Sequence, residues 1–401
     1  MPPAEGGGME ISMKKIHIGG VYYGLHNIGD EAILSSIIDS FKEYELSISS
    51  FGSKWILKKS PNVEIRDIKV DYVKPKFGLF ISPKKKLMSN YYKLYKEEQF
   101  YKNVDAYICG GATILSDCPW YSLRTVQLAC DVNTPVLLWG VGMAELNDDE
   151  TKRYIKKVLN LRNVKRIFTR DQFVRDRLID LGVNPEKIDV CYDPAIMIEA
   201  SDINIKSYLT ESQLELYNDD KPKFVFSLSG ESDVIQRTPL KTIVSAIRTI
   251  INKYDANLFL IPTGCGEHCK DRDFLKQIDD EVNDTRITVI NAEFSPQDLV
   301  TFLARVDVII SSRLHLNILG ACAAVPSIGL VRNTKIIDFA TLMNLPYLEL
   351  EDLKSEEIVE AVDHIFSEKV KRSEYITSVV GKMKEQYLTA LNKAKELIEH
   401  F

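Results

Sequence analysis

Side chains that could do chemistry are most concentrated between Ser311 and His315, where one apolar run ends and another begins. Arg313 offers a planar, permanently charged group that suits a carboxylate or a phosphate. His315 is the side chain type best able to exchange protons near neutral pH, although a lone histidine is more often structural. Because Ser312 and these two residues gather where a buried strand is predicted to end, we interpret the group as functional.

A second group lies in residues 19–31, which read Gly-Gly-Val-Tyr-Tyr-Gly-Leu-His-Asn-Ile-Gly-Asp-Glu. The glycines permit a tight turn between a predicted strand and a predicted helix, and backbone amides at such a turn can bind an anion. The glycine spacing does not match the dinucleotide-binding fingerprint. Asn27 and Asp30 could serve only as helix caps, but the run from Asn27 to Glu31 holds more polar groups than one cap needs. We therefore predict a functional role here.

Two further cations follow predicted strands. Arg170 ends a strand where Asp171 can cap the next helix, so a ligand contact and a structural Arg–Asp pair are both open. Lys335 follows the strand after His315 and could supply another cation to the same place. Glycine turns at 110–111 and 140–142 end two more strands, either as ligand contacts or as close strand-to-helix crossings.

Residues 265–269, Cys-Gly-Glu-His-Cys, invite a zinc interpretation because they hold two thiols and an imidazole. Zinc sites usually pair two such groups, and no second Cys or His pair lies at the usual spacing. We therefore predict no metal site and a polar loop, from which Glu267 or His268 could reach the cleft.

The elements that must position these residues follow a repeating pattern. From Lys14 onward, short β-branched runs end in turns and are followed by segments of helical length, such as 30–44, 242–254 and a helix capped by Ser295. This alternation predicts an α/β protein with two doubly wound, Rossmann-like domains that face a cleft. In such sheets ligands bind beyond the carboxyl ends of the strands. The predicted divisions are a flexible leader at 1–13 (with Met9 or Met13 as alternative starts), an N-terminal domain at 14–200, a linker region at 201–222, a C-terminal domain at 223–370 and a C-terminal helix at 371–401.

Composition limits the function classes. The chain has 401 residues, of which 45% are hydrophobic and 27% charged, which excludes a disordered, collagenous or coiled-coil protein. The net charge of −6 gives no general attraction to nucleic acid. Seven irregularly spaced cysteines form no disulfide framework, and no apolar run reaches the roughly 20 residues of a membrane span. These features predict a cytoplasmic protein.

The stretch Lys69–Lys102 interleaves lysines with phenylalanines and tyrosines. Such a composition suits peripheral contact with an anionic membrane surface, here the inner face. A solvated excursion with a few packed aromatic side chains is an equally good interpretation.

Taken together, these segments resemble the polysaccharide pyruvyl transferase family. The blocks from Asn27 to Glu31 and from Ser312 to His315 are the most specific, and Ala112 stands where the family commonly has a third glycine. The matching blocks, in chain order, are Tyr23–Leu34, Asp105–Gly111, Gly140–Gly142, Thr169–Asp171, Leu181–Val183, Asp193–Pro194, Ser312–His315, Pro326 and Lys335–Phe339.

The resemblance implies transfer of pyruvate from phosphoenolpyruvate onto two hydroxyls of a sugar acceptor, free or lipid-linked, which gives a cyclic ketal in cell-surface polysaccharide biosynthesis. It implies no cofactor besides this donor substrate, and a fold similar to the two-domain glycosyltransferase B architecture. His315 would be the general acid, and Asp30 or Glu31 would orient or deprotonate the sugar. The donor would be held by Arg313, Lys335, Arg170 and Ser312. The other expected substrate contacts are Asn27, Gly29, Tyr23, Gly110, Gly111 and Gly142.

Three other functions remain open at this point. A nucleotide-sugar glycosyltransferase or epimerase could have the same two-domain plan. A non-catalytic sugar-binding member would be expected to have lost some of Arg313, His315 and Lys335, all of which are present. A membrane-associated assembly factor rests only on Lys69–Lys102.

Overall fold

The computed structural model describes residues 13–21, 23–50, 63–67, 99–117, 119–202, 205–264 and 270–401. Its first sheet has seven parallel strands in the order β3-β2-β1-β4-β5-β6-β7. The central strands β4 and β5 are buried at every residue, as expected for a sheet covered by helices on both faces. The elements of this part are β1 (Lys15–Gly19), α1 (Ile28–Ser40), β2 (Glu45–Ser50), β3 (Glu64–Asp67), β4 (Ala106–Gly110), α5 (Trp120–Asp131), β5 (Val136–Val141), α6 (Asp149–Leu159), β6 (Val164–Thr169), α7 (Gln172–Asp180), η2 (Pro185–Lys187), β7 (Ile188–Val190) and η3 (Pro194–Met197).

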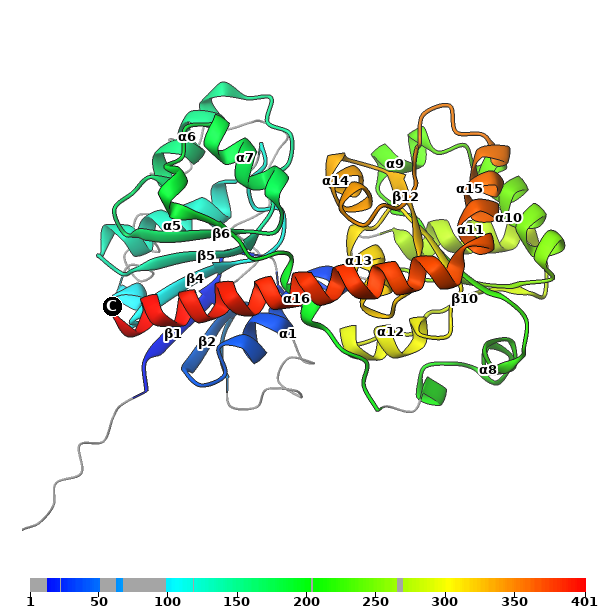
Figure 1. The fold of residues 1–401 in the computed structure, drawn as a ribbon, viewed down its shortest axis with the longest axis horizontal. Coiled ribbons are helices and arrows are strands. Elements are labelled where there is room, and N and C mark those ends of the chain that lie inside the picture. The colour runs from blue at the N-terminus through cyan, green and yellow to red at the C-terminus, as the bar shows by residue number, and fades with distance from the viewer. Residues whose placement is uncertain are drawn as a thin grey trace, which may run out of the picture.

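The second sheet has six parallel strands in the order β10-β9-β8-β11-β12-β13. Two short elements precede it, η4 (Ile205–Ser207) and α8 (Glu211–Asn218). Its own elements are β8 (Lys223–Ser227), α9 (Ser232–Arg237), α10 (Leu240–Tyr254), β9 (Asn257–Leu260), α11 (Asp271–Val282), β10 (Ile287–Val289), α12 (Pro296–Leu303), β11 (Val308–Ser311), α13 (Leu314–Cys322), β12 (Ser327–Val331), α14 (Thr334–Leu342), β13 (Tyr347–Glu349) and α15 (Ser355–Ser367). The predicted fold class, two doubly wound α/β domains, is confirmed (Figure 1).

Each sheet reverses its winding direction once. The order changes between β1 and β4 in the first sheet and between β8 and β11 in the second. At such a switch point the loops after the two central strands separate and leave a crevice, which is where ligands of this architecture bind. The segments singled out in the sequence, after β1, β4 and β11, all lie at these switch points.

Some local details differ from the sequence expectations. The first helix begins at Ile28 and ends at Ser40, not at Tyr44, because Phe41 leaves helical geometry and is fully buried. The region expected to be a linker contains α8, which begins with a capping box between Thr210 and Gln213. Ser295 caps α12 as predicted, with its hydroxyl accepting from the Asp298 amide.

The two domains are joined by a long final helix and by direct contacts. Helix α16 (Lys369–Glu399) runs from the second domain back across the first (Figure 1). There the Tyr387 hydroxyl accepts a hydrogen bond from the Trp139 indole at 3.0 Å. Between the domains, the Ile28 amide donates to the Thr263 carbonyl at 3.0 Å, and Arg177 pairs in bidentate fashion with Asp338.

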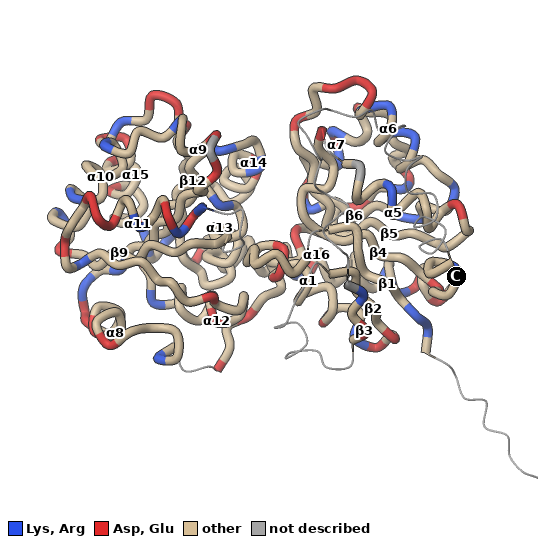
Figure 2. The backbone as a smooth tube through the Cα atoms, turned by 180° about the vertical axis from the view of Figure 1, so that it is seen from behind, with Lys and Arg blue, Asp and Glu red and all other residues tan. Residues whose placement is uncertain are grey.

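Charged residues of both signs are distributed over both domains (Figure 2). No helix in the described part of the chain is long and apolar enough to span a membrane. Within the same residues, no cluster of His, Cys, Asp or Glu could hold a metal ion. Most of Lys69–Lys102, and all of 265–269, lie outside the described residues, so the membrane and zinc interpretations are not addressed there.

Candidate active site

A cleft of about 380 Å³ lies between the domains at the two switch points. A smaller pocket of about 30 Å³ adjoins it and shares Leu314 and Lys335 as lining residues. The polar residues that line the main cleft are Asn27, Asp30, Thr113, Ser116, Ser122, Thr263, Ser312, Arg313, His315, Arg332 and Lys335. The structure therefore brings together segments from opposite halves of the chain.

His315 is held between a carboxylate and a glycine. It lies in the first turn of α13, and its Nε2 atom is 3.5 Å from Oδ2 of Asp193, which follows β7. Burial opposes the ionisation of Asp193, but the charges of His315 and Arg170 outweigh it and hold the pKa of this carboxyl below its usual value. On the other side, a Cβ atom added to Gly29 would lie 2.1 Å from the Nδ1 atom of His315. Only glycine therefore leaves room for the imidazole at this place.

Asp30 and Lys335 face each other from the two domains. Burial raises the pKa of Asp30, while the nearby His315 and Lys335 act against that rise. Burial, together with the charges of Arg170 and Arg332, lowers the pKa of Lys335 to about 8. Among the described residues, no hydrogen bond or ion pair engages the Lys335 ammonium group. Lys335 is thus a cation of the cleft that is available to an anionic ligand.

Arg170 follows β6, as the sequence predicted, and lines the smaller pocket. Its Nε donates to Asp171 at 3.3 Å and its Nη1 to the Thr113 hydroxyl at 3.2 Å, while the buried Nη2 has no hydrogen-bond partner. The guanidinium group lies against Gly142, where a Cβ atom would be 2.6 Å from its Cζ and Nη1 atoms. Arg170 thus forms the expected pair with Asp171, and its contact with a ligand stays a prediction.

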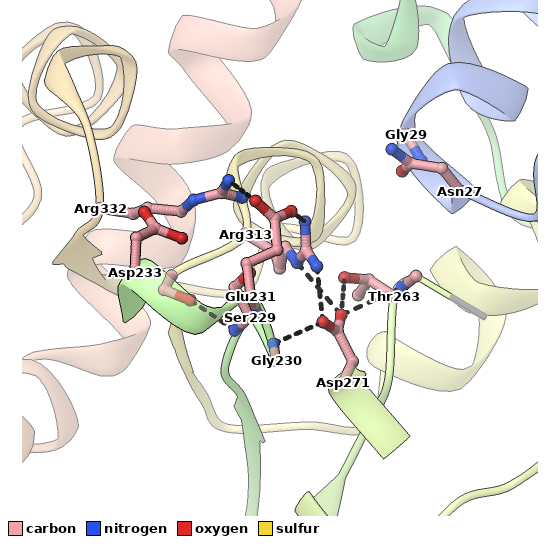
Figure 3. A network of polar contacts seen from close by, with 12 residues as sticks. Asn27, Gly29, Ser229, Gly230, Glu231, Asp233, Thr263, Asp271, Arg313 and Arg332 are labelled. Atoms are coloured by element: carbon pink, nitrogen blue, oxygen red, sulfur yellow. Dashed lines mark hydrogen bonds and ion pairs between the residues drawn. The ribbon is translucent and has the colours of Figure 1, made fainter. Parts of the chain in front are cut away.

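Arg313 lines the cleft but is already paired with two carboxylates (Figure 3). Its Nε and Nη2 donate to Asp271 at 3.1 and 2.5 Å, and its Nη1 donates to Glu231 at 3.3 Å. The other oxygen of Glu231 accepts from Arg332. This network lies opposite Asn27 and Gly29 of the first domain.

Several expected site residues lie behind the cleft lining. Glu31 is only 2% exposed, and its Oε1 accepts from the Gly24 amide, so it holds the turn before α1. Tyr23 is fully buried and donates to the Gly110 carbonyl. Gly110 and Gly111 pack against Ile37 and Ile33 of α1. The expected direct substrate contacts of these four residues are therefore not supported by the geometry of the cleft.

The remaining expected residues have clear positions. Asn27 caps α1 by accepting from the Gly29 amide, and it also lines the cleft. The hydroxyl of Ser312 accepts from the Ser229 amide at 2.9 Å, which joins the loops after β8 and β11. Ala112 has a φ of 57°, a left-handed geometry that explains why glycine is common at its position.

Sequence reasoning missed Asp193, Asp271, Glu231 and Arg332 as site residues. The sequence does mark Asp193, because an Asp-Pro pair follows a predicted strand there. Its contact with His315, however, depends on packing between the domains. The sequence does not mark Asp271 or Glu231, since each resembles an ordinary acidic residue at a helix start.

The fold is similar to that of several solved structures. The match to MnaA from S. aureus in complex with UDP has a TM-score of 0.65 at 15% identity. It covers 97% of this chain and 98% of the MnaA chain. The UDP-GlcNAc 2-epimerase from Neisseria meningitidis bound to UDP-GlcNAc has a TM-score of 0.62 at 11% identity, with coverage of 94% and 100%. Alr3699/HepE from Anabaena in complex with UDP-glucose has a TM-score of 0.60 at 11% identity, with coverage of 97% and 100%. At these identities the likeness shows the shared fold alone.

No curated protein sequence matches this chain. The family model for polysaccharide pyruvyl transferase matches residues 27–334, a range that begins at the cap of α1 and ends at the first residue of α14. It therefore includes the cleft loops of both domains, from Asn27 to Arg332. The chain belongs to the polysaccharide pyruvyl transferase family.

Proposed function

We propose that the protein transfers pyruvate from phosphoenolpyruvate to two hydroxyls of a sugar, giving a cyclic ketal and inorganic phosphate. The observation that carries this proposal is the combination of His315, Asp30 and Lys335 in one cleft of a chain from this family. Such a reaction needs a proton donor, a base for the hydroxyls and cations for the donor's phosphate and carboxylate. His315, Asp30 and Lys335 are of the chemical types that these roles require.

In the proposed reaction, His315 as imidazolium delivers a proton to the methylene carbon of the donor. The Asp193 carboxylate, 3.5 Å from Nε2, would accompany the positive charge of this imidazolium. The carbon that bears the phosphate then has oxocarbenium character, and a sugar hydroxyl attacks it while Asp30 takes the hydroxyl proton. A raised pKa makes Asp30 a better base than an ordinary aspartate.

The phosphate leaves with cleavage of its bond to this carbon, and the second hydroxyl closes the ring at the same atom. The former methylene becomes a methyl group. One of the two hydroxyl protons is thus balanced by the proton gained at carbon, and the other leaves with the phosphate. The carboxylate of the donor stays on the product, so the cations that hold it act throughout the reaction.

The proposal is tested by calorimetric titration of the purified chain with phosphoenolpyruvate, and separately with UDP-N-acetylglucosamine. We expect phosphoenolpyruvate to bind and Lys335→Met to weaken it. His315→Asn should leave this binding within a few-fold, because the imidazole acts in proton transfer, and should abolish phosphate release in the presence of acceptor sugars. Phosphate release that persists in His315→Asn would contradict the assigned acid.

A second candidate is a reaction on a UDP-sugar. The observation that favours it is the fold, which is shared with structures that contain UDP, UDP-GlcNAc and UDP-glucose. Binding of UDP-N-acetylglucosamine without binding of phosphoenolpyruvate would move the protein to this class.

A further inference from the structure

The two carboxylates that contact Arg313 differ in how firmly they are held. Asp271 is fully buried, and besides the guanidinium group it accepts from the amides of Gly230 at 2.7 Å and Gly264 at 3.1 Å. The side chain of Glu231 is 39% exposed. The contacts of the Glu231 carboxylate run to two guanidinium groups, Oε1 to Arg313 and Oε2 to Arg332 (Figure 3).

Glu231 can leave this place at low cost. It is the residue before the short helix α9, but its side chain makes no capping hydrogen bond there. Its carboxylate is partly exposed, so water can solvate it when the ion pairs open, and an incoming anion would compensate the two guanidinium groups that it leaves. Asp271 cannot leave in the same way, since a buried carboxylate that lost Arg313 would stay uncompensated. The pair of Arg313 and Asp271 is therefore the fixed part of the network, and Glu231 is the exchangeable part.

The place that Glu231 occupies has the chemistry of a phosphate site. Arg313 and Arg332 both line the cleft, with side chains 14% and 19% exposed, and they present guanidinium donors to two oxygens of one anion. Guanidinium groups are suited to such paired contacts with phosphate oxygens. A phosphate dianion carries twice the charge of the carboxylate that it would replace.

We infer that Arg313 and Arg332 form a phosphate subsite of the cleft, and that the Glu231 carboxylate occupies it until a phosphate group displaces it. The assignment of this phosphate to phosphoenolpyruvate rests on the proposed function; the subsite itself does not. Arg332 becomes a binding residue on this inference. Glu231 becomes a competitor of the ligand, which raises the ligand concentration needed for occupancy.

The test is calorimetric titration of the full chain at pH 7.5 and fixed chloride concentration, with inorganic phosphate as the probe and pyruvate as a carboxylate that lacks phosphate. The variants are Glu231→Gln, Arg332→Gln and the double variant. The matched control is Asp233→Asn, because Asp233 lies two residues after Glu231, in α9, and its ion pair is with Arg237.

We expect Glu231→Gln to tighten phosphate binding by about tenfold, and Arg332→Gln to weaken it by about tenfold. In the double variant the gain from Glu231→Gln should be smaller, because without Arg332 the carboxylate competes only for Arg313. Asp233→Asn should leave phosphate affinity within about twofold of wild type. Pyruvate binding should respond less to Arg332→Gln than phosphate binding does, because a carboxylate carries half the charge of a phosphate dianion. In a steady-state assay with phosphoenolpyruvate, Glu231→Gln should lower KM.

Two results would overturn the inference: phosphate affinity that is unchanged or weaker in Glu231→Gln, or affinity that is unchanged in Arg332→Gln. The second variant keeps the test decisive even if the first folds poorly. Failure of the proposed function would look different, since phosphate would bind with the expected pattern while phosphoenolpyruvate gave no turnover with any acceptor.

Discussion

At the scale of single residues, the site depends on a contact that the sequence could suggest but not specify. Gly29 lies in the first turn of α1, where its backbone has ordinary helical geometry, so glycine is not required by the helix. It is required by His315 of the other domain, whose ring fills the space of the missing side chain. The position of the imidazole is thus set from both sides of the cleft.

Replacing Gly29 with Ala should displace this imidazole and lower kcat by about 100-fold, since a shift near 1 Å at a reacting group can cost that much. The free energy of unfolding should fall by about 1–3 kcal/mol, because the added Cβ overlaps the imidazole and overpacking outweighs the better helix propensity of alanine. Turnover assays, urea denaturation and the NMR signals of the His315 ring would measure these effects. Full activity in Gly29→Ala would show that the contact is not needed.

The affinity of the cleft for an anion should fall as pH rises through about 8, because the protonated form of Lys335 is the one that binds and its pKa is lowered to about that value. Lys335→Arg should remove the fall, since a guanidinium group stays charged in this range. Titration with inorganic phosphate between pH 7.5 and 9.5 tests both statements. An equal decline in the arginine variant would exclude Lys335 as its cause.

Glu31 should make folding stability depend on pH. Burial raises its pKa from 4.5 to about 8, so the carboxyl is mostly protonated at neutral pH. Stability is fully present below the ordinary pKa and is lost as pH rises through about 8, when the buried group ionises. Wild-type protein should lose about 2–4 kcal/mol more than Glu31→Gln between pH 6 and 9.5 in urea denaturation. The exposed Glu385→Gln should behave as wild type.

At the scale of elements, the sequence was sufficient for the doubly wound fold class and for most of the strands, because parallel strands buried on both faces read as short apolar runs. It did not mark β2, β3 or β13, and it gave no order of the strands in either sheet. It was sufficient for the loops that carry Arg170, Arg313, His315 and Lys335, since polar residues at strand ends stand out. It could not separate Asp30 from Glu31, because adjacent positions on a helix face different directions and only packing decides which one lines the cleft. It could not assign the partners of Arg313 either, as these lie on loops whose approach depends on the tertiary fold.

In helix α16, the effect of helix propensity on stability can be measured separately from the effect of side-chain packing. An added Cβ at Gly381 would meet no atom within 4 Å, so Gly381→Ala should stabilise the protein by about 0.5–1 kcal/mol. Gly320→Ala in α13 should destabilise it, because the new Cβ would lie 2.3 Å from Cδ1 of Ile309. Urea denaturation of the two variants should therefore give shifts of opposite sign. Shifts of the same sign would contradict this account.

At the scale of the whole molecule, the cleft exists only because two domains meet. Asp30, Gly29 and Asp193 come from the first domain, while His315, Arg313 and Lys335 come from the second. Neither domain alone holds both an acid and a base for the proposed reaction. The contacts from Ile28 to Thr263 and from Arg177 to Asp338 therefore help to set the distances within the site.

The course of α16 has a consequence for how the chain is made. This helix covers Trp139 with Tyr387, pairs Lys393 with Asp189, and accepts a hydrogen bond from Lys14 at its Ile398 carbonyl. The first domain is thus built from two stretches, with the whole second domain inserted between them. During synthesis on the ribosome, the apolar surface around Trp139 stays exposed to solvent until the residues after Lys369 have emerged. A chain that stops before Lys369 should hold a first domain that cannot close its core, and a second domain that lacks the contacts of Lys369 with Asp307 and of Arg372 with Asn344.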